Sequence, residues 1–397
     1  MTKRKIILGE YLEFEKGISV PRDRLSITNN IAYLHYGDIY KIYNHVVDID
    51  KEIDNILKIS TDEKYKKTQL LKDGDIVYNL TSESVDDLGK AVYIRNPNNI
   101  PFVSGMETTI MRVTDKSILL PEYLNYILST YKFKCLLRQY VTGMKVYRVH
   151  PRDIGRIEIE VPDINEQKKI IDILNPFNDK IELNNQMNQT LEKIASLLYK
   201  RWFVDFEFPD DKGNPYKSSG GEMVDSELGM IPKGWEVKEL GSFFDVITGK
   251  KNANVSEKNG RYRFFTCSRN FTYSDQFEFD TGAIILAGNG DFNVKWYRGK
   301  FDAYQRTYVL SPHNQILLDV LFWIIRERLF EITVASKGSV IKFITKGMIE
   351  NFKIIFPKKS YSKFVIIFSC LNKINEQNTQ NNELVENLKL EILKELC

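Results

Sequence analysis

One pair of segments carries the residue types of a metal-dependent nuclease site. Pro209-Asp210, followed by Glu236-Val237-Lys238, offers two carboxylates and a lysine. Such a site works only when its carboxylates lie on adjacent strands around Mg²⁺. Here the first pair begins a stretch rich in Gly, Pro, Ser and acidic residues, from Pro209 to Gly234, which is typical of a linker. We therefore expect no nuclease site in this chain.

The other sequences that look like catalytic motifs also lack essential parts. Asn175-Pro176-Phe177 and Asn214-Pro215-Tyr216 lack the second proline of the Asn-Pro-Pro-Tyr loop of amino-methyltransferases. Gly288-Asn289-Gly290 is typical of a turn, because no Rossmann unit surrounds it. No P-loop sequence occurs, and the four histidines and four cysteines have no metal-ligand spacing. The sequence predicts no catalytic site, no metal site and no cofactor in this chain.

Polar residues beside glycines and on polar loops are the remaining candidates, and their chemistry suits DNA. Lysine or arginine beside a glycine turn can approach phosphates closely, and threonine or serine adds neutral donors. Arginine and glutamine can read guanine and adenine edges. The alternative for each residue is a solvated strand end. The candidates are Thr142, Gly143, Lys145, Arg148, Asn289, Lys295, Arg298, Gln305, Arg306, Ser336, Lys337, Gly338, Ser339 and Lys342.

Composition favours a folded chain of two or three domains with a mild preference for polyanions. The chain has 397 residues, of which 43% are hydrophobic, and its net charge is +3. Residues 240–357 carry 16 Lys and Arg against 11 Asp and Glu. The four cysteines have no C-x-x-C spacing, and no apolar run of signal-peptide length follows Met1. These features predict a protein of the reducing cytoplasm.

Two stretches predict long helices that pair with each other. Core positions from Ile170 to Trp202, and again from Ile367 to Ile392, alternate gaps of four and three residues. At about 1.5 Å per residue the first stretch spans about 50 Å. Asparagines near the middle of each seam would fix the register of an antiparallel pair. The predicted pairing residues are Ile181, Asn184, Asn188, Leu191, Leu198, Ile374, Asn378, Asn381, Val385 and Leu388.

Proline and an internal repeat set the expected boundaries. Pro176 predicts a kink or a fresh helix start, with the main rod running from Pro176 to Phe203. Leu8-Gly9 recurs as Leu240-Gly241, so the chain repeats one unit of a domain and a helix. The predicted class is α+β, with mixed α/β domains. The expected segments are a first domain, a central helix, a linker, a second domain and a C-terminal helix, at residues 1–162, 163–206, 207–235, 236–357 and 358–397.

Several segments together resemble one protein family. Trp202-Phe203-Val204-Asp205-Phe206 is the most specific, and Glu166-Gln167-Lys168 and Asp179 to Asn184 accompany it. In the linker, Gly213 to Met223 and Glu227 to Trp235 are equally specific. These segments resemble the specificity subunit of type I restriction–modification enzymes, and the resemblance covers the whole chain. Pro176 and an Asn-rich second helix that stops at Cys397 depart from the family pattern.

The resemblance implies two target-recognition domains and two spacer helices that pair as an antiparallel coiled coil. It implies a subunit without catalytic activity that docks two modification subunits, which bind S-adenosylmethionine and methylate adenine N6. Restriction subunits would add ATP-driven translocation and Mg-dependent cleavage of DNA. Each recognition domain would read one half of a bipartite double-stranded site, with no membrane involved.

Two alternatives remain beside this reading, and the helix length gives one further expectation. An enzyme with a hidden site would bind S-adenosylmethionine or Mg²⁺ by itself. A free-standing sequence-specific DNA-binding protein would bind DNA tightly without partners, which the modest net charge disfavours. Seam-flanking Leu183 and Tyr199 suggest that partner proteins cover the helices. Readers about one DNA turn apart predict a non-specific spacer of roughly 5–8 bp.

Overall fold

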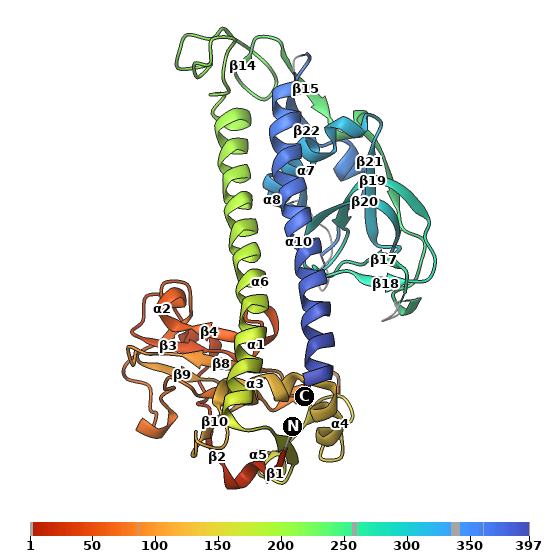
Figure 1. The fold of residues 1–397 in the computed structure, drawn as a ribbon. Helices are drawn as coiled ribbons and strands as arrows, with labels where there is room; N and C mark the ends of the chain where they lie inside the picture. Colours follow the sequence, from red (N-terminus) through yellow and green to blue (C-terminus); the bar gives the residue numbers. More distant parts are fainter. Residues whose placement is uncertain (1–2, 86, 256–259, 335–341, 360, 397) are drawn as a thin grey trace. The chain divides into compact units, whose positions relative to one another are not determined.

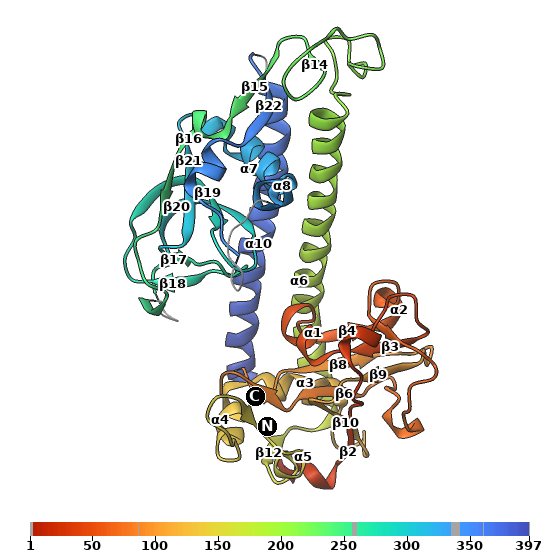
Figure 2. The ribbon, with the colours of Figure 1, turned by 180° about the vertical axis from the view of Figure 1, so that it is seen from behind.

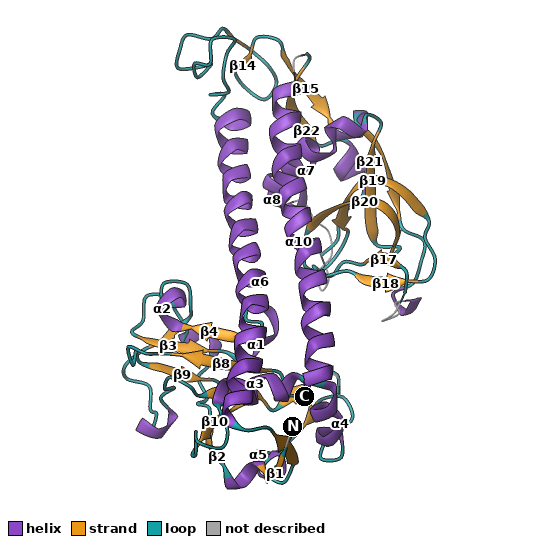
Figure 3. Cartoon of the chain, viewed as in Figure 1, coloured by secondary structure: helices purple, strands orange, loops and turns teal. Residues whose placement is uncertain are grey.

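The chain forms two compact units, each with its own β-rich domain (Figure 1). The structure is a computed structural model that describes residues 3–85, 87–255, 260–334, 342–359 and 361–396. Unit 1 is Met1–Leu183 with Asn381–Cys397, and unit 2 is Asn184–Gln380. Figure 3 shows helices and strands mixed within each unit, as the α+β prediction requires. The units divide both long helices, whereas the sequence boundaries treated each helix as a separate segment.

Unit 1 is built around a five-stranded sheet with the order β2-β10-β6-β8-β4. All neighbours in it are antiparallel except β4 and β8. A smaller sheet has the order β5-β3-β9. In Figures 1 and 2 this smaller sheet projects away from the C-terminal part of the last helix. The strands are β2 (Leu12–Lys16), β3 (Ile31–Leu34), β4 (Val46–Asp48), β5 (Lys58–Ile59), β6 (Ile76–Asn79), β8 (Ala91–Arg95), β9 (Phe102–Ser104) and β10 (Thr108–Val113).

Helix α3 (Pro121–Ser129) begins at a proline, which suits the first turn of a helix, and it packs on the larger sheet with every residue from Tyr123 to Leu128 buried. In β8, Val92 and Ile94 alternate with half-buried residues, the pattern of a strand with one buried face. The other elements of unit 1 before the long helix are β1 (Arg4–Ile7), η1 (Leu8–Glu10), η2 (Arg22–Arg24), α1 (Tyr36–Lys41), α2 (Ile49–Glu52), η3 (Lys67–Gln69), β7 (Thr81–Ser82), α4 (Tyr131–Arg138), β11 (Tyr147–Arg148), α5 (Pro151–Ile154) and β12 (Glu158–Val161).

Unit 2 is built around a six-stranded sheet with the order β16-β21-β19-β20-β17-β18. Helix α7 (Leu318–Glu327) packs on this sheet, and all but its last two residues are buried. The strands are β16 (Phe244–Thr248), β17 (Tyr262–Phe265), β18 (Thr272–Ser274), β19 (Phe279–Ala287), β20 (Val294–Ala303) and β21 (Thr307–Pro312). The remaining elements are η4 (Lys200–Val204), β13 (Met223–Val224), β14 (Ile231–Pro232), β15 (Trp235–Glu239), η5 (Leu240–Ser242), η6 (Ala253–Val255), η7 (Gln315–Leu317), α8 (Leu329–Val334), α9 (Lys346–Glu350) and β22 (Lys353–Pro357).

The two units share a frame that explains the repeated Leu-Gly pair. In unit 1, β1 pairs antiparallel with β12, and in unit 2, β15 pairs antiparallel with β22. A Cβ on Gly9 would lie 2.9 Å from the Gly155 carbonyl oxygen, and one on Gly241 would lie 3.2 Å from that of Glu350. Glycine therefore gives room for a close approach where each 3₁₀ turn meets the segment before the closing strand. The long helices α6 (Ile164–Tyr199) and α10 (Ser362–Leu396) follow these closing strands.

Helix α6 runs from Ile164 through Pro176, so the expected fresh start there, with the main rod beginning at Pro176, is wrong. Proline removes one backbone hydrogen bond, and tertiary contacts on the same turn stabilise the helix instead. The Asn175 amide accepts from the Tyr126 hydroxyl at 2.8 Å and donates to Glu122 Oε1 at 3.1 Å. After Tyr199 the chain makes a π-helical turn, Lys200–Val204, that places Trp202 against the rings of Phe364 and Phe368.

Within each unit, polar side chains join α6 to α10. In unit 1, Lys389 Nζ donates to Asn178 Oδ1 at 3.1 Å, and Lys389 is only 5% exposed. In unit 2, Asn378 Nδ2 donates to Asn188 Oδ1 at 2.9 Å, and Asn188 Nδ2 donates to Thr379 Oγ1 at 3.4 Å. In unit 1 these contacts join the early part of α6 to the late part of α10, and in unit 2 they join the late part of α6 to the middle of α10.

A buried histidine predicts acid sensitivity of unit 1. His45 stacks on Tyr126 at 4.1 Å between ring centroids, and burial, assisted by Lys389, lowers its pKa to about 3. In the unfolded chain the imidazole of His45 takes up a proton near pH 6.5, whereas in the folded chain this imidazole stays neutral until the pH approaches 3. The free energy of unfolding therefore falls as the pH drops from about 6.5 towards 3, by up to about 1.4 kcal/mol per pH unit. Thermal unfolding scans of His45→Phe should show a flatter pH profile over that range than the wild type. The exposed His313→Gln serves as the control, and equal slopes for all three proteins would contradict the prediction.

Candidate functional site

Three segments of unit 2 that are far apart in the sequence meet beside one end of the sheet. The Gly288 amide donates to the Arg306 carbonyl at 2.9 Å, and the Ile344 amide donates to the Gly288 carbonyl at 3.0 Å. The Gly290 amide donates to the Lys342 carbonyl at 3.1 Å. A Cβ on Gly288 would lie 2.5 Å from the Arg306 carbonyl oxygen, so only glycine allows this approach. The bonds bring together the candidates Asn289, Gln305, Arg306 and Lys342.

These segments line a hollow of about 420 Å³ with both apolar and polar side chains. We call its apolar lining residues, Tyr308, Phe343 and Ile344, the floor, and its polar lining residues, Asn289, Gln305 and Arg306, the rim. The Tyr308 hydroxyl donates to the Ile344 carbonyl at 3.0 Å, and burial raises the pKa of Tyr308, so the floor stays neutral. Gln305 and Arg306 are exposed, and neither side chain has a hydrogen-bond or ion-pair partner within the described part of the chain. The rim can therefore bind phosphates or base edges.

Two other candidates of unit 2 are engaged inside the fold. Lys295 Nζ donates to the Thr266 carbonyl at 3.1 Å, to Asn293 Oδ1 at 2.8 Å and to the Ser268 carbonyl. Burial lowers the pKa of Lys295 to about 8. Because three oxygens already surround this ammonium group, DNA would have to displace them to reach it.

Arg298 supports helix α7 through a buried acid. Its Nη2 lies 2.7 Å from Asp319 Oδ2, and Asp319 Oδ1 accepts from Asn372 Nδ2 at 2.7 Å. The Asn372 side chain also accepts from Trp323 Nε1 at 2.9 Å. The arginine thus balances a carboxylate that is 2% exposed. The sequence could not separate this role from base reading, since the acid lies 21 residues away.

The candidates of unit 1 form the tip of an exposed hairpin. The Thr142 amide donates to the Arg148 carbonyl at 2.9 Å, and the Arg148 amide donates to the Thr142 carbonyl at 2.8 Å. Gly143 has φ +103°, and a Cβ there would lie 2.0 Å from the Val146 carbonyl oxygen. Strand β11 joins the hairpin to β7. Lys145 and Arg148 are exposed, so the turn presents two cations to solvent.

Four candidates, Ser336, Lys337, Gly338 and Ser339, lie outside the described residues. Lys342, which follows them, is exposed and lies next to the hollow. Sequence reasoning missed Tyr308 and Phe343, because a search for polar residues does not select the apolar floor of a binding site. Their signal was their position close to Arg306 and Lys342.

The predicted pairing residues fall into two groups. Ile181, Asn184 and Asn378 are buried, and Asn188, Leu191, Leu198 and Val385 are half-buried. Ile374, Asn381 and Leu388 are exposed. At those three places the residue one position further along the chain is half-buried or buried instead: Asn375, Asn382 and Lys389. The sequence argument chose two apolar side chains over polar ones, whereas hydrogen bonds such as Lys389 to Asn178 allow polar residues on this face.

The segments that looked catalytic hold the backbone together. Asp210 Oδ1 accepts from the amides of Lys212 and Asn214, both at 2.8 Å, and caps a turn. On β15, Glu236 pairs with Lys238 at 3.1 Å. Over the residues that the structure describes, no group of three His, Cys, Asp or Glu side chains could hold a metal ion. No helix in that part of the chain is long and apolar enough to cross a bilayer.

Comparison with known proteins gives consistent matches. A family model, the type I restriction modification DNA specificity domain, matches residues 6–193 and 232–389. The chain is 42% identical over 132 residues to the specificity subunit of the type I restriction enzyme EcoDI of Escherichia coli, covering 33% of this chain and 30% of that subunit. It is 28% identical over 270 residues to the MjaIX specificity subunit of Methanocaldococcus jannaschii, covering 62% and 60%. The chain thus spans less than two thirds of either relative.

One solved structure shares the fold over the whole chain. It is the crystal structure of a type I restriction–modification system S subunit from M. genitalium, with a TM-score of 0.54 and 13% identity. The match covers 100% of this chain and 96% of that one.

Proposed function

The chain belongs to the type I restriction modification DNA specificity family, and from this premise we propose that it is the specificity subunit of such a complex. Each of its two recognition domains, residues 1–162 and 236–357, reads one half of a bipartite double-stranded DNA site. The observation that carries the proposal is the twofold match of the family domain, at residues 6–193 and 232–389. A chain with two diverged copies of one reading domain suits a site with two different halves.

The second domain reads its half-site with the rim of the hollow. Arg306 and Gln305 offer the bidentate donors and acceptors that suit guanine and adenine edges, and Lys342 offers a phosphate contact. In the first domain, Lys145 and Arg148 of the exposed hairpin supply charge for the phosphate backbone. Lys295 and Arg298 act by holding the domain's shape, because their polar groups are engaged internally.

The reactions take place on partner subunits. Two modification subunits bind S-adenosylmethionine and methylate adenine N6, and restriction subunits bring ATP and Mg²⁺ for translocation and cleavage. The long helices dock the modification subunits. Support for this comes from α6 within unit 2, where Met187, Ile194 and Leu197 are 41%, 41% and 67% exposed. Their spacing of seven and three residues puts these apolar side chains on one face, away from the buried Ala195.

The helices also set the separation of the two half-sites. We propose that α6 and α10 pair as an antiparallel coiled coil, with Asn188 and Asn378 fixing its register through their 2.9 Å hydrogen bond. A shift by one heptad would leave both amides without this partner, so one helix alignment is favoured. The number of helical residues then determines the length of the non-specific spacer.

A free-standing DNA-binding protein is the second candidate. It would show tight, sequence-specific binding by the purified chain alone, whereas a specificity subunit gains its full affinity only when modification subunits are bound. Gel-shift titrations of the chain with and without the modification subunits separate the two functions.

A substitution in the rim of the hollow tests whether each domain reads only one half-site. Arg306→Ala should relax recognition at one or two positions of a single half-site, costing about 1–3 kcal/mol there, because a bidentate base contact is lost. The other half-site should be unaffected. The measurement is the methylation rate of the assembled complex on a set of duplexes with single substitutions in each half. Lys300→Ala, on the same domain and exposed, is the matched control. A loss spread evenly over both halves would contradict the proposal.

A further inference from the structure

A turn in unit 1 presents three lysines to solvent. Lys64, Lys66 and Lys67 are exposed and lie just before or within η3, and we call residues 64–69 the lysine turn. Within the described chain, none of the three ammonium groups takes part in an ion pair. The acids around them are engaged elsewhere: Glu63 pairs with Arg24 at 3.1 Å, and Asp62 accepts from Ser60 Oγ at 3.0 Å.

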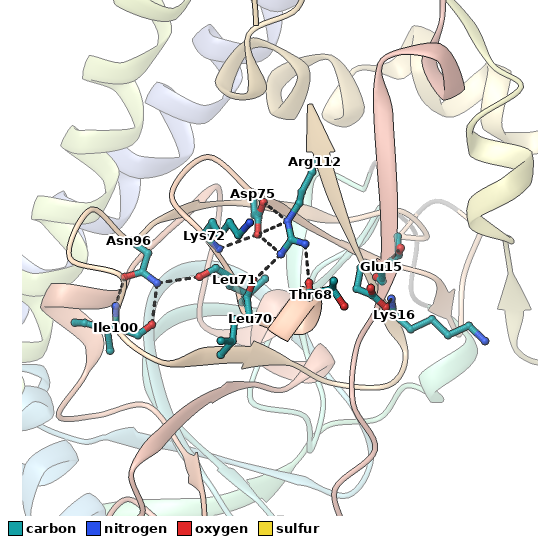
Figure 4. Close-up of polar contacts among 11 residues, drawn as sticks. Glu15, Lys16, Thr68, Leu70, Leu71, Lys72, Asp75, Asn96, Ile100 and Arg112 are labelled. Atoms are coloured by element: carbon teal, nitrogen blue, oxygen red, sulfur yellow. Dashed lines mark hydrogen bonds and ion pairs between the residues drawn. The ribbon is translucent and has the colours of Figure 1, made fainter. Parts of the chain in front are cut away.

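A buried ion pair is hydrogen-bonded to the backbone at the end of this turn (Figure 4). Arg112 on β10 donates from Nε to Asp75 Oδ1 and from Nη2 to Asp75 Oδ2, both at 3.0 Å. The same guanidinium donates to the carbonyls of Thr68 and Leu70, both at 2.6 Å. Asp75 also accepts from the Lys72 amide at 2.8 Å. The side chains of Arg112 and Asp75 are 16% and 5% exposed, so the pair that holds these carbonyls is largely shielded from solvent.

A second set of contacts ties the turn to the neighbouring strand β2. Gln69 Nε2 donates to the Lys16 carbonyl at 2.9 Å, and Gln69 Oε1 accepts from the Lys66 amide at 2.8 Å. A hydrogen bond from the Thr68 side chain is the main cause that lowers the pKa of Glu15. The C-terminal half of the turn is therefore tied to β2, and Glu15 on that strand is already bonded to Thr68.

Burying the Arg112–Asp75 ion pair costs free energy, and a need to hold the turn in place explains why the pair is there. Removing two charges from water carries a penalty that their attraction need not repay, and burial does raise the pKa of Asp75 while Arg112 opposes it. The main structural effect of the pair is to hold the carbonyls of Thr68 and Leu70 in place. A fixed backbone reduces the freedom that the lysines lose when they bind a rigid polyanion.

We propose that the lysine turn of the first recognition domain binds the phosphate backbone of double-stranded DNA, with Arg112 as its positioning residue. This inference rests on the proposed function. Ammonium groups on flexible stems contact phosphates as point charges and carry no base preference. The turn therefore contributes affinity and salt dependence, and leaves the recognised sequence unchanged.

The test compares Lys66→Gln/Lys67→Gln with the wild type, each assembled with its modification subunits. The probes are a duplex carrying the methylated motif and a scrambled duplex of equal length. Two lost phosphate contacts should make the slope of log K against log salt concentration shallower by about 1.8. The methylated motif should not change. Lys116→Gln, an exposed lysine elsewhere in unit 1, should retain the wild-type slope.

An unchanged salt slope in the double variant would overturn the inference, and so would loss of the modification subunits, which would make the turn a protein contact. A wild-type complex that does not distinguish the two duplexes would instead refute the proposed function. Arg112→Lys provides a second measurement. It keeps the positive charge but removes the guanidinium group that donates to the carbonyls of Thr68 and Leu70. If Arg112 positions the turn, this variant should assemble with the modification subunits as the wild type does, but its slope of log K against log salt concentration should be shallower. A slope equal to that of the wild type would contradict the positioning role.

Discussion

Adding seven residues to each long helix should lengthen the non-specific spacer of the recognised site by about 3 bp. Seven residues extend a helix by about 10.5 Å, and DNA rises about 3.4 Å per base pair. The insertions go after Gln189 in α6 and before Gln377 in α10, on the same side of the Asn188–Asn378 bond. A complete heptad keeps the buried faces of both helices in phase. The measurement is methylome sequencing of cells that carry the extended chain.

The control for this prediction is a seven-residue insertion after Ser219, in the exposed linker between the helix and the second domain. It should leave the spacer as it is in the wild type. Both half-sites should keep their base sequences in the extended chain, because neither recognition domain has changed. A spacer of unchanged length in the chain with both helix insertions would show that the helices do not set the separation.

Placing two carboxylates on the exposed face of α6 should abolish methylation. In Ile194→Glu/Leu197→Glu, an interface that buries this face would have to bury two unpaired charges, which costs several kcal/mol. The free chain should keep its stability, because both side chains are exposed. Mass measurement of the purified complex should then show the chain without modification subunits.

The matched control is Ile194→Met/Leu197→Met, which keeps the face apolar. It should assemble and methylate at close to the wild-type level, since volume-conserving apolar changes cost little. If the glutamate variant assembled normally, the modification subunits would have to dock on a different surface.

Local sequence patterns were enough for the frame of the molecule. The repeated Leu-Gly pair marks the same 3₁₀ turn in both units, where glycine gives room for a close backbone approach. The two long helices lie where the alternating gaps of four and three residues predict them. Pro176 was misjudged because the contacts of Asn175 with Tyr126 and Glu122 come from residues about 50 positions away.

The details of the site depend on contacts between distant residues. In the sequence Arg298 has the residue type of a base reader, but the structure shows it paired with Asp319. Lys295 likewise has the residue type of a DNA contact, but three oxygens surround its Nζ. Arg112 drew no attention in the sequence, because the acid and the carbonyls that it holds lie 37 to 44 residues before it. Of the residues chosen for DNA, the structure brings four together at the hollow, and that gathering is the part that periodicity cannot predict.

The claim that this chain reads two separate half-sites is tested most directly by methylome sequencing of cells that carry it with its modification subunits. We expect N6-methyladenine at one asymmetric motif, with two short defined halves separated by roughly 5–8 undefined base pairs. A contiguous motif without an undefined spacer, or methylation that does not depend on this chain, would contradict it.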